Sequence, residues 1–147
     1  MDSEILYFDV AHAIEVHDYI INHSGGLHGN RDIGLLDSVL DHIQNDMYYP
    51  TLVEKLTHLV FSVNKFHAFN DGNKRASLIL GAYFLELNGC DYCVRTFTLR
   101  MENIVVWVAE GKISKDLLGE IIQSLIEEDD YNEALKLKIL EAVNFND

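Results

Sequence analysis

Several residue types are scarce in this sequence, and each shortage excludes a class of protein. The 147 residues include one proline, one tryptophan and two cysteines. A single proline beside nine glycines excludes a proline-rich linker or a low-complexity arm. Cations are also few, since 11 Lys and Arg face 24 Asp and Glu and leave a net charge of −13. Because this charge repels phosphate backbones and anionic lipids, we expect neither nucleic acid nor a membrane as a partner.

The two cysteines, Cys90 and Cys93, form one Cys-x-x-Cys pair, and no second pair is present to complete a zinc site. No strand followed by a helix surrounds them, which argues against a thioredoxin-like redox motif. We interpret them as ordinary thiols in a reducing cytosol and expect a cytoplasmic protein. The N-terminal residues are acidic and lack a long apolar run, so we expect neither a signal peptide nor a membrane anchor.

The residues that are abundant predict a globular, helical protein. Hydrophobic residues make up 48% of the chain and charged residues 24%, and the length suits one domain over residues 1–147. Apolar residues recur with helical spacing. We predict an all-α fold, a compact bundle of six or seven helices around a buried central helix. The predicted helices are Asp9 to about His23, Asp32 to about Ile43, Leu52 to Phe66, Asn73 to Leu87, Thr98 to about Gly111, Ser114 to Glu128 and Tyr131 to Val143.

Three local features qualify this pattern. Asp91 to Phe97 is predicted to be a short extended piece, followed by Thr98 as a helix N-cap. Gln44 to Pro50 interrupts the periodicity, and a small surface hairpin and a plain loop with its tyrosines on the core fit it equally well. In the first helix, His12 and His17 are five residues apart, which misses the spacing of four that places two metal ligands on one face.

The stretch from Phe66 to Ala76 concentrates polar residues between two apolar helical segments. Because both flanking helices are expected to be buried, this turn should be held rigidly and is a candidate site. Free N–H groups and the helix dipole at Asn73 attract an anion, and phosphate is the natural occupant. Gly72 lets a ligand approach the backbone closely, and Lys74 and Arg75 add positive charge.

Three further residues of this stretch have chemical or structural interest. His67 can act as a general base near neutral pH. Asp71 would complete a magnesium site together with phosphate oxygens. Phe69 is an apolar anchor that fixes the turn in the core. Taken singly, each residue also fits a plain alternative, an interhelical turn with Asp or Asn as N-cap and a histidine at a helix end.

The string His67-Ala68-Phe69-Asn70-Asp71-Gly72-Asn73-Lys74-Arg75 resembles the active-site motif of the Fic/Doc superfamily, His-x-Phe-x-Asp/Glu-Gly-Asn-x-Arg. All specified positions of that motif are filled. The lysine within the motif resembles the Doc (death-on-curing) branch in particular, and the similarity extends over about residues 5–110. Upstream segments that also resemble this branch are Gly25-Gly26-Leu27-His28-Gly29, Arg31-Asp32 and Leu35-Leu36-Asp37-Ser38-Val39-Leu40.

The resemblance implies an activity and assigns roles to residues. Members of the superfamily transfer a phosphorus-containing group from a nucleotide to a hydroxyl group of a protein, which implies ATP and Mg²⁺ as cofactors. By resemblance, His67 removes the proton of the attacking Ser, Thr or Tyr hydroxyl, and Asp71 holds the magnesium ion. The resemblance also assigns nucleotide binding to Phe69, Gly72, Asn73, Lys74 and Arg75.

Within the superfamily, the Doc-like resemblance implies a toxin of a toxin–antitoxin system. Such a toxin transfers the γ-phosphate of ATP to a target such as translation elongation factor Tu and has an antitoxin as partner. The first alternative is an AMP-transferase, which usually has Gly in place of Lys74 and a second Arg in place of Leu78. An alternative of another class is a non-catalytic module that binds a nucleotide or phosphate at the same turn.

The resemblance also bears on two other segments. In Fic-like folds, the segment corresponding to Gln44–Pro50 is a flap whose edge aligns the target protein by strand addition. The residues from Thr98 to Asn103 match a pattern by which some Fic proteins inhibit themselves with a glutamate. Because short patterns recur by chance, we favour a helix N-cap at Thr98.

Overall fold

The computed structural model describes residues 4–29, 32–66, 68–128 and 130–144. Within these ranges the chain forms seven helices and no strand, which confirms the predicted all-α bundle. The helices are α1 (Val10–Ser24), α2 (Ile33–His42), α3 (Leu52–Lys65), α4 (Asn73–Leu87), α5 (Asp91–Ala109), α6 (Lys115–Glu127) and α7 (Glu133–Asn144).

Polar side chains fix where four of these helices begin. Each N-cap side chain accepts a hydrogen bond from the backbone N–H three residues later, which satisfies a donor that the first helical turn leaves open. All four N-caps follow directly from the sequence pattern. They are Asp9 for α1, Asp32 for α2, Thr51 for α3 and Ser114 for α6.

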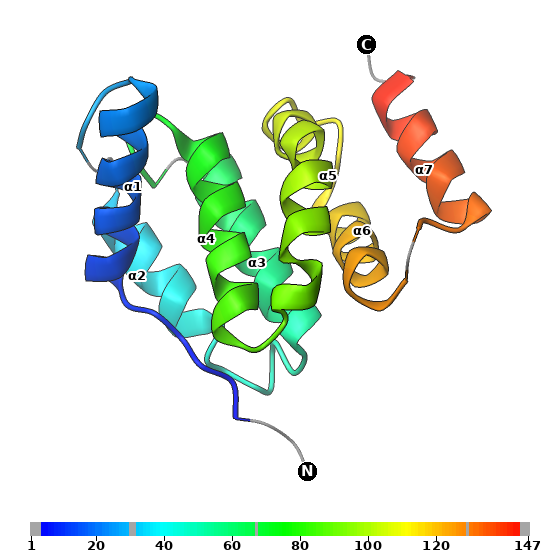
Figure 1. Ribbon diagram of the computed structural model, residues 1–147, viewed down its shortest axis with the longest axis horizontal. Helices are drawn as coiled ribbons and strands as arrows, with labels where there is room; N and C mark the ends of the chain where they lie inside the picture. The colour runs from blue at the N-terminus through cyan, green and yellow to red at the C-terminus, as the bar shows by residue number, and fades with distance from the viewer. Residues whose placement is uncertain (1–3, 30–31, 67, 129, 145–147) are drawn as a thin grey trace.

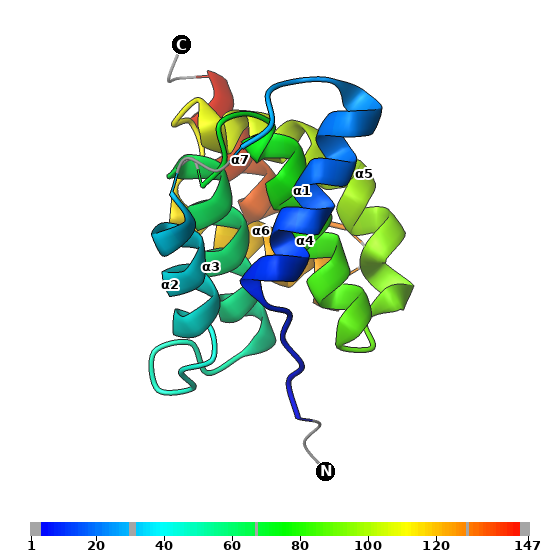
Figure 2. The ribbon, with the colours of Figure 1, turned by 90° about the vertical axis from the view of Figure 1, so that its left-hand side faces the viewer.

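The predicted central helix, α4, packs against α1, α3 and α5, as Figures 1 and 2 show from two sides. It lies close to its neighbours at Gly81, where a Cβ atom would lie 2.8 Å from Val60 and 3.0 Å from Phe97. Glycine is therefore required where α3, α4 and α5 meet. One side of α4 faces solvent, since Ile79 is 43% exposed.

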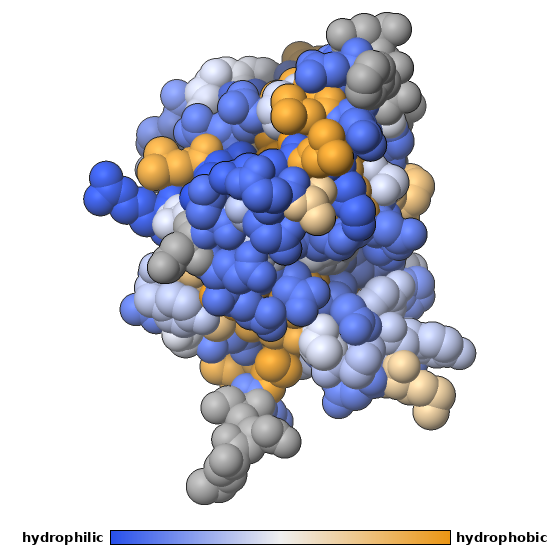
Figure 3. All heavy atoms as spheres, turned by 90° about the vertical axis from the view of Figure 1, so that its right-hand side faces the viewer, coloured by the Kyte–Doolittle hydropathy of each residue, from blue (hydrophilic) through white to orange (hydrophobic). Residues whose placement is uncertain are grey.

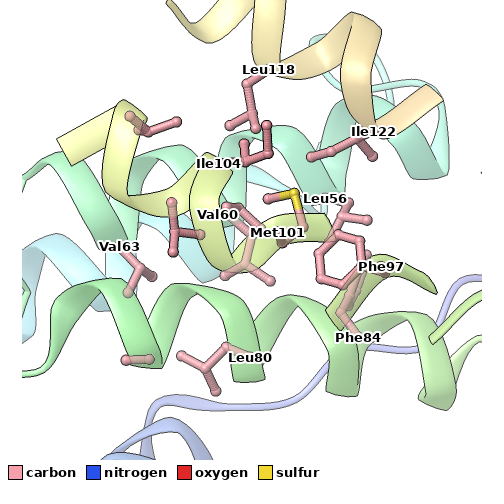
Figure 4. Packing of buried hydrophobic residues seen from close by; sticks show 14 of the residues in the cluster. Leu56, Val60, Val63, Leu80, Phe84, Phe97, Met101, Ile104, Leu118 and Ile122 are labelled. Carbon is pink, nitrogen blue, oxygen red and sulfur yellow. The ribbon is translucent and has the colours of Figure 1, made fainter. Parts of the chain in front are cut away.

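Side chains from α3, α4, α5 and α6 interdigitate in the main core (Figure 4). Figure 4 labels Leu56, Val60, Val63, Leu80, Phe84, Phe97, Met101, Ile104, Leu118 and Ile122 among its members. Burying such a stripe is the main source of stability for an amphipathic helix, so this core fixes α3 and α4 relative to each other. The candidate site lies where α3 ends and α4 begins.

Helix α7 lies at the far end of the bundle from α1 and packs against α6 (Figure 1). The face of the molecule on that side is largely hydrophilic, with separate apolar patches (Figure 3). Among the described residues, no helix has the length and apolar character needed to cross a membrane.

The prediction of an extended piece from Asp91 to Phe97 was wrong. Those residues are the first part of α5, so Thr98 lies inside a helix and cannot be its N-cap. The β-branched and aromatic residues of this segment suggested a strand, but Cys93, Phe97 and Met101 are buried at helical spacing. Tertiary packing of this stripe overrides the local propensity. Glu102, the glutamate of the inhibition-like pattern, lies on the exposed side of α5.

Residues 44–50 form turns without a strand, so of the two alternatives for this segment the hairpin is wrong. The side chain of Asn45 accepts hydrogen bonds from the N–H groups of Met47 and Tyr48, which closes an Asx-type turn instead of a strand ladder. The ammonium of the fully buried Lys55 donates to Asp46 at 2.7 Å. The plain-loop alternative is half correct, because Tyr49 stacks on the ring of His58 whereas Tyr48 is 73% exposed.

Candidate active site

The polar turn lies where α3 ends and α4 begins, beside the C-terminal ends of α1 and α5 (Figure 1). A pocket of about 400 Å³ opens next to it. Its lining combines the turn itself with one residue from α3 and one from α5. These residues are Asn64, Asn70, Asp71, Gly72, Asn73, Lys74, Arg75 and Ala109.

Asn73 shapes the turn with its side-chain amide. Its Oδ1 accepts a hydrogen bond from the N–H of Phe69 at 3.0 Å, and its Nδ2 donates to the carbonyl of Phe69 at 3.0 Å. Phe69 is fully buried, as expected of an anchor. Because the amide of Asn73 is committed to the turn, the contribution of this residue to a bound phosphate would come from its backbone N–H.

Gly72 is the N-cap of α4 and adopts a left-handed conformation with φ +73°. No side chain caps this helix end, in contrast to the four helices with Asp, Thr or Ser caps. The N–H groups of the first turn of α4 are therefore available for an anion, and the helix dipole favours negative charge at this end. This geometry is what a phosphate group requires.

Asp71 presents its carboxylate at the mouth of the same turn. Its Oδ1 accepts from the N–H of Gly72 at 2.8 Å, and its Oδ2 accepts from the N–H of Leu27 at 3.1 Å. These two backbone hydrogen bonds lower the pKa of Asp71, with that of Gly72 the larger cause and the nearby Arg75 a further one. The carboxylate thus stays ionised and keeps acceptor capacity for a cation.

A glycine-rich loop after α1 closes over Asp71. At Gly26, where φ is +120°, a Cβ atom would lie 2.7 Å from Asp71 Oδ2. The guanidinium of Arg75 donates to the carbonyl of Gly25 at 3.3 Å, and the N–H of Asn70 donates to the carbonyl of Gly29 at 3.1 Å. The Gly25-Gly26 pair therefore allows the backbone of this loop to lie close to the turn. The sequence alone did not reveal this contact.

The two cations of the turn are placed differently. Lys74 is exposed, whereas Arg75 is half-buried beside the glycine loop. Together with the start of α4 they form a local positive region in a protein whose net charge is −13. Phosphate binding in such an acidic protein requires a local concentration of donors and cations of this kind.

Sequence reasoning missed His17, a residue of α1 that is fully buried against the turn. Its ring stacks on Phe69 with centroids 3.9 Å apart, and its Nε2 lies 2.6 Å from the carbonyl oxygen of Asp71. A weak signal is present in the sequence, because an imidazole on an otherwise apolar helix face needs a polar partner when it is buried. Its partner is 54 residues away, which no local pattern indicates.

The structure brings six of the seven predicted site residues together, namely Phe69, Asp71, Gly72, Asn73, Lys74 and Arg75. The seventh, His67, lies outside the described residues. The donor set fits magnesium that is held jointly with a nucleotide, because Mg²⁺ usually takes one or two carboxylates plus phosphate oxygens and water. In the described part of the chain, no three His, Cys, Asp or Glu residues form a metal site of their own.

Comparison with known proteins identifies the family of this chain. The model of the Fic/DOC family matches residues 7–85, which is more than half of the chain, and the protein belongs to this family. The chain is 30% identical over 117 residues to the protein kinase doc of Escherichia phage P1, covering 76% of this chain and 89% of the relative. It is also 35% identical over 93 residues to the toxin Doc of Mycolicibacterium smegmatis, covering 60% of this chain and 72% of the relative.

Proposed function

We propose that this protein is a Doc-like toxin that transfers the γ-phosphate of ATP to a Ser, Thr or Tyr hydroxyl of a target protein and is held inactive by an antitoxin. The observation that carries the proposal is the uncapped N-terminus of α4 beside the ionised Asp71. The similarity to relatives named as a protein kinase and a toxin supports the same class.

In the proposed reaction each residue of the turn has one role. The backbone N–H groups from Asn73 onward hold phosphate oxygens, and Lys74 and Arg75 offset negative charge in the transition state. Asp71 would hold Mg²⁺, which lowers the repulsion between the phosphates and the incoming oxygen. His67 takes the proton of the hydroxyl as its oxygen attacks the γ-phosphorus, and the bond from that phosphorus to the ADP oxygen breaks.

Two alternatives differ from this proposal in their residue requirements. In an AMP-transferase the target hydroxyl would attack the α-phosphorus. Lys74 and Leu78 depart from the usual sequence pattern of such enzymes. A binding module would use the same N–H groups without a base, because phosphate binding at a helix end needs no proton acceptor. Chemistry, by contrast, requires His67.

The test uses ATP labelled separately at the α and γ positions. Purified protein is incubated with Mg²⁺, each labelled ATP and either bacterial lysate or elongation factor Tu. The proposal predicts that γ-label reaches protein, that α-label does not, and that His67→Ala lowers the transfer at least about 100-fold, the minimum for a general base. His23→Ala, at an exposed position of α1, is the matched control and should retain activity.

Each contrary result points to a different alternative. Transfer of α-label would replace the kinase assignment with AMP transfer. Binding of ATP without transfer of either label would favour the binding module. Transfer by His67→Ala at more than about a tenth of the wild-type rate would remove the general-base assignment.

A further inference from the structure

We propose that His17 is a positioning residue that locks the peptide bond between Asp71 and Gly72 in the orientation needed for phosphate binding. This inference rests on the proposed function, because it concerns the same phosphate-binding turn. His17 is fully buried in α1 and contacts the turn at two points, the ring of Phe69 and the carbonyl of Asp71. His17 is not itself among the residues that line the pocket.

The hydrogen bond fixes the chemical state of the imidazole. A backbone carbonyl only accepts, so Nε2, at 2.6 Å from the oxygen of Asp71, carries the hydrogen and donates it. The other ring nitrogen, Nδ1, is buried and has no hydrogen-bond partner in the described part of the chain. The imidazole therefore commits Nε2 as a donor to the peptide bond of the turn.

The orientation of the ring is fixed as well. The imidazole and the phenyl ring of Phe69 are parallel within 2° at a centroid distance of 3.9 Å. Asn73 in turn holds both backbone polar groups of Phe69. The Nε2 donor that binds the carbonyl of Asp71 therefore belongs to a ring whose orientation is fixed by stacking on the buried Phe69.

This donor decides which way the following N–H group points. In a trans peptide bond the C=O and N–H groups point in opposite directions, and the described chain has no cis peptide bond. With the carbonyl of Asp71 held toward α1, the N–H of Gly72 points away from α1 and donates to the carboxylate of Asp71. A flip of this peptide bond would turn the N–H toward α1, remove a donor from the carboxylate of Asp71 and direct a carbonyl oxygen toward it instead.

The backbone itself does not prevent such a flip. A flip changes ψ of Asp71 and φ of Gly72, and glycine adopts positive and negative φ with similar ease. The positive φ of Gly72, +73°, is therefore one of several accessible values. A Cβ atom at this position would lie 3.2 Å from Ile21, which is a tight contact, and 3.6 Å from His17 Nε2, which is an ordinary one. Because glycine does not restrict the orientation of this peptide bond, the hydrogen bond from His17 restricts it instead.

Three substitutions separate the hydrogen bond from the packing. In His17→Gln the amide nitrogen can occupy the place of Nε2, whereas in His17→Asn it can reach only the place of Nδ1. His17→Phe keeps an aromatic ring on Phe69 and removes the donor. In each variant, NMR of the free protein follows the amide of Gly72 and the carbonyl carbon of Asp71, and calorimetry gives the affinity for Mg²⁺·ATP.

We expect His17→Gln to keep the wild-type signals and an affinity within about threefold of wild type. His17→Asn and His17→Phe should shift or broaden the Gly72 and Asp71 signals and weaken Mg²⁺·ATP binding about tenfold or more, because a buried hydrogen bond to the turn is lost. The KM for ATP should rise more than kcat falls. If His17→Gln keeps the wild-type properties and His17→Asn loses them, His17 acts by positioning the turn. A merely structural role would be disturbed by both substitutions.

Unchanged Gly72 and Asp71 signals in folded His17→Phe would overturn the proposal, as would equal effects of Gln and Asn. The NMR comparison uses the protein without ligand, so it decides the role of His17 even if the wild type fails to bind ATP. That failure would count against the proposed function alone. A His17→Phe protein that does not fold leaves the comparison of Gln with Asn as the deciding measurement.

Discussion

The side-chain amide of Asn73 closes both backbone hydrogen bonds of Phe69, one in each direction and each 3.0 Å long. This pair of bonds replaces the regular secondary structure that the chain loses between α3 and α4. It also ties the first residue of α4 to the buried anchor of the turn. A single amide thus determines how the start of the helix is presented to a ligand.

Asn73→Ala should therefore lower the free energy of unfolding by about 1–3 kcal/mol, because it leaves the two backbone groups of Phe69 without partners in a buried place. Denaturant unfolding followed by circular dichroism measures the change. Asn70→Ala is the matched control, since Asn70 is exposed and its Nδ2 donates one long bond of 3.3 Å to the carbonyl of His28. Equal losses in the two variants would show that Asn73 does not order the turn.

The two glycines after α1 offer a test of the contact with Asp71. Gly26→Ala places a methyl group 2.7 Å from Asp71 Oδ2, so the carboxylate must move away from the N–H of Leu27. At Gly25, also at positive φ, an added Cβ atom would meet nothing within 4 Å. We expect both variants to lose about 1 kcal/mol of stability from backbone strain, and only Gly26→Ala to weaken Mg²⁺-dependent ATP binding.

Calorimetric titration with ATP, in the presence and in the absence of Mg²⁺, separates these effects. If the Gly25 and Gly26 variants lose the same affinity for Mg²⁺·ATP, then the loop acts through strain and not through the position of the carboxylate.

Some features of the fold are determined by residues that are close together in the sequence. Caps such as Asp9 and Thr51 are local, because the acceptor and the N–H group it satisfies are three residues apart. The sequence therefore predicted where these helices begin. The motif from His67 to Arg75 is also contiguous, and six of its seven predicted site residues gather in one turn.

The features that the sequence did not predict depend on residues that are distant along the chain. Asp91 to Phe97 has strand-like propensity, and it becomes helical because Phe97 and Met101 pack against α3 and α4. The contacts of Asp71 with Leu27 and His17 span 44 and 54 residues. Without a tertiary structure, His17 was only a histidine with the wrong spacing for a metal site.

Growth of bacterial cells tests the biological part of the proposal. Expression of the wild-type chain without an antitoxin should arrest growth, because the transferred phosphate inactivates the target. Asp71→Ala should relieve the arrest by removing the proposed metal ligand. Asp18→Ala changes an exposed carboxylate that pairs with His28 at 3.5 Å and should leave the arrest intact. Normal growth with the wild-type chain, at equal expression, would count against the toxin assignment.

A second polar cluster, remote from the turn, predicts a pH dependence of stability. The Nδ1 atom of His58 lies 2.8 Å from the ammonium nitrogen of Lys115. The pKa of His58 is lowered to about 4, chiefly by burial and also by the positive charge of Lys115 and by the neighbouring His42. In the unfolded chain a histidine titrates near pH 6.5.

Between pH 6.5 and about 4, the unfolded state therefore binds a proton on His58 that the folded state does not bind. Stability should fall as the pH is lowered through this range, by on the order of 2 kcal/mol from this group once solvent screening is included. In His58→Gln, which keeps an acceptor for Lys115, the fall should be smaller by that amount. Parallel stability curves for the two proteins, measured by denaturant unfolding at each pH, would refute the assignment.

The last prediction concerns Lys74, which separates the proposed kinase from the alternative AMP-transferase. Lys74 is exposed at the start of α4, where the AMP-transferring pattern has a small residue. A long cation at this helix end favours the nucleotide pose in which phosphate charge lies next to it, and the pose decides which phosphorus faces the hydroxyl.

Lys74→Gly should weaken γ-phosphate transfer and allow slow AMP transfer, limited by Leu78 in place of a second arginine. Mass spectrometry of the target measures the outcome as about 80 Da for phosphate or about 329 Da for AMP. Lys74→Arg, which keeps the positive charge, is the control and should retain γ-phosphate transfer. AMP on the target with wild-type Lys74 in place would refute the kinase assignment.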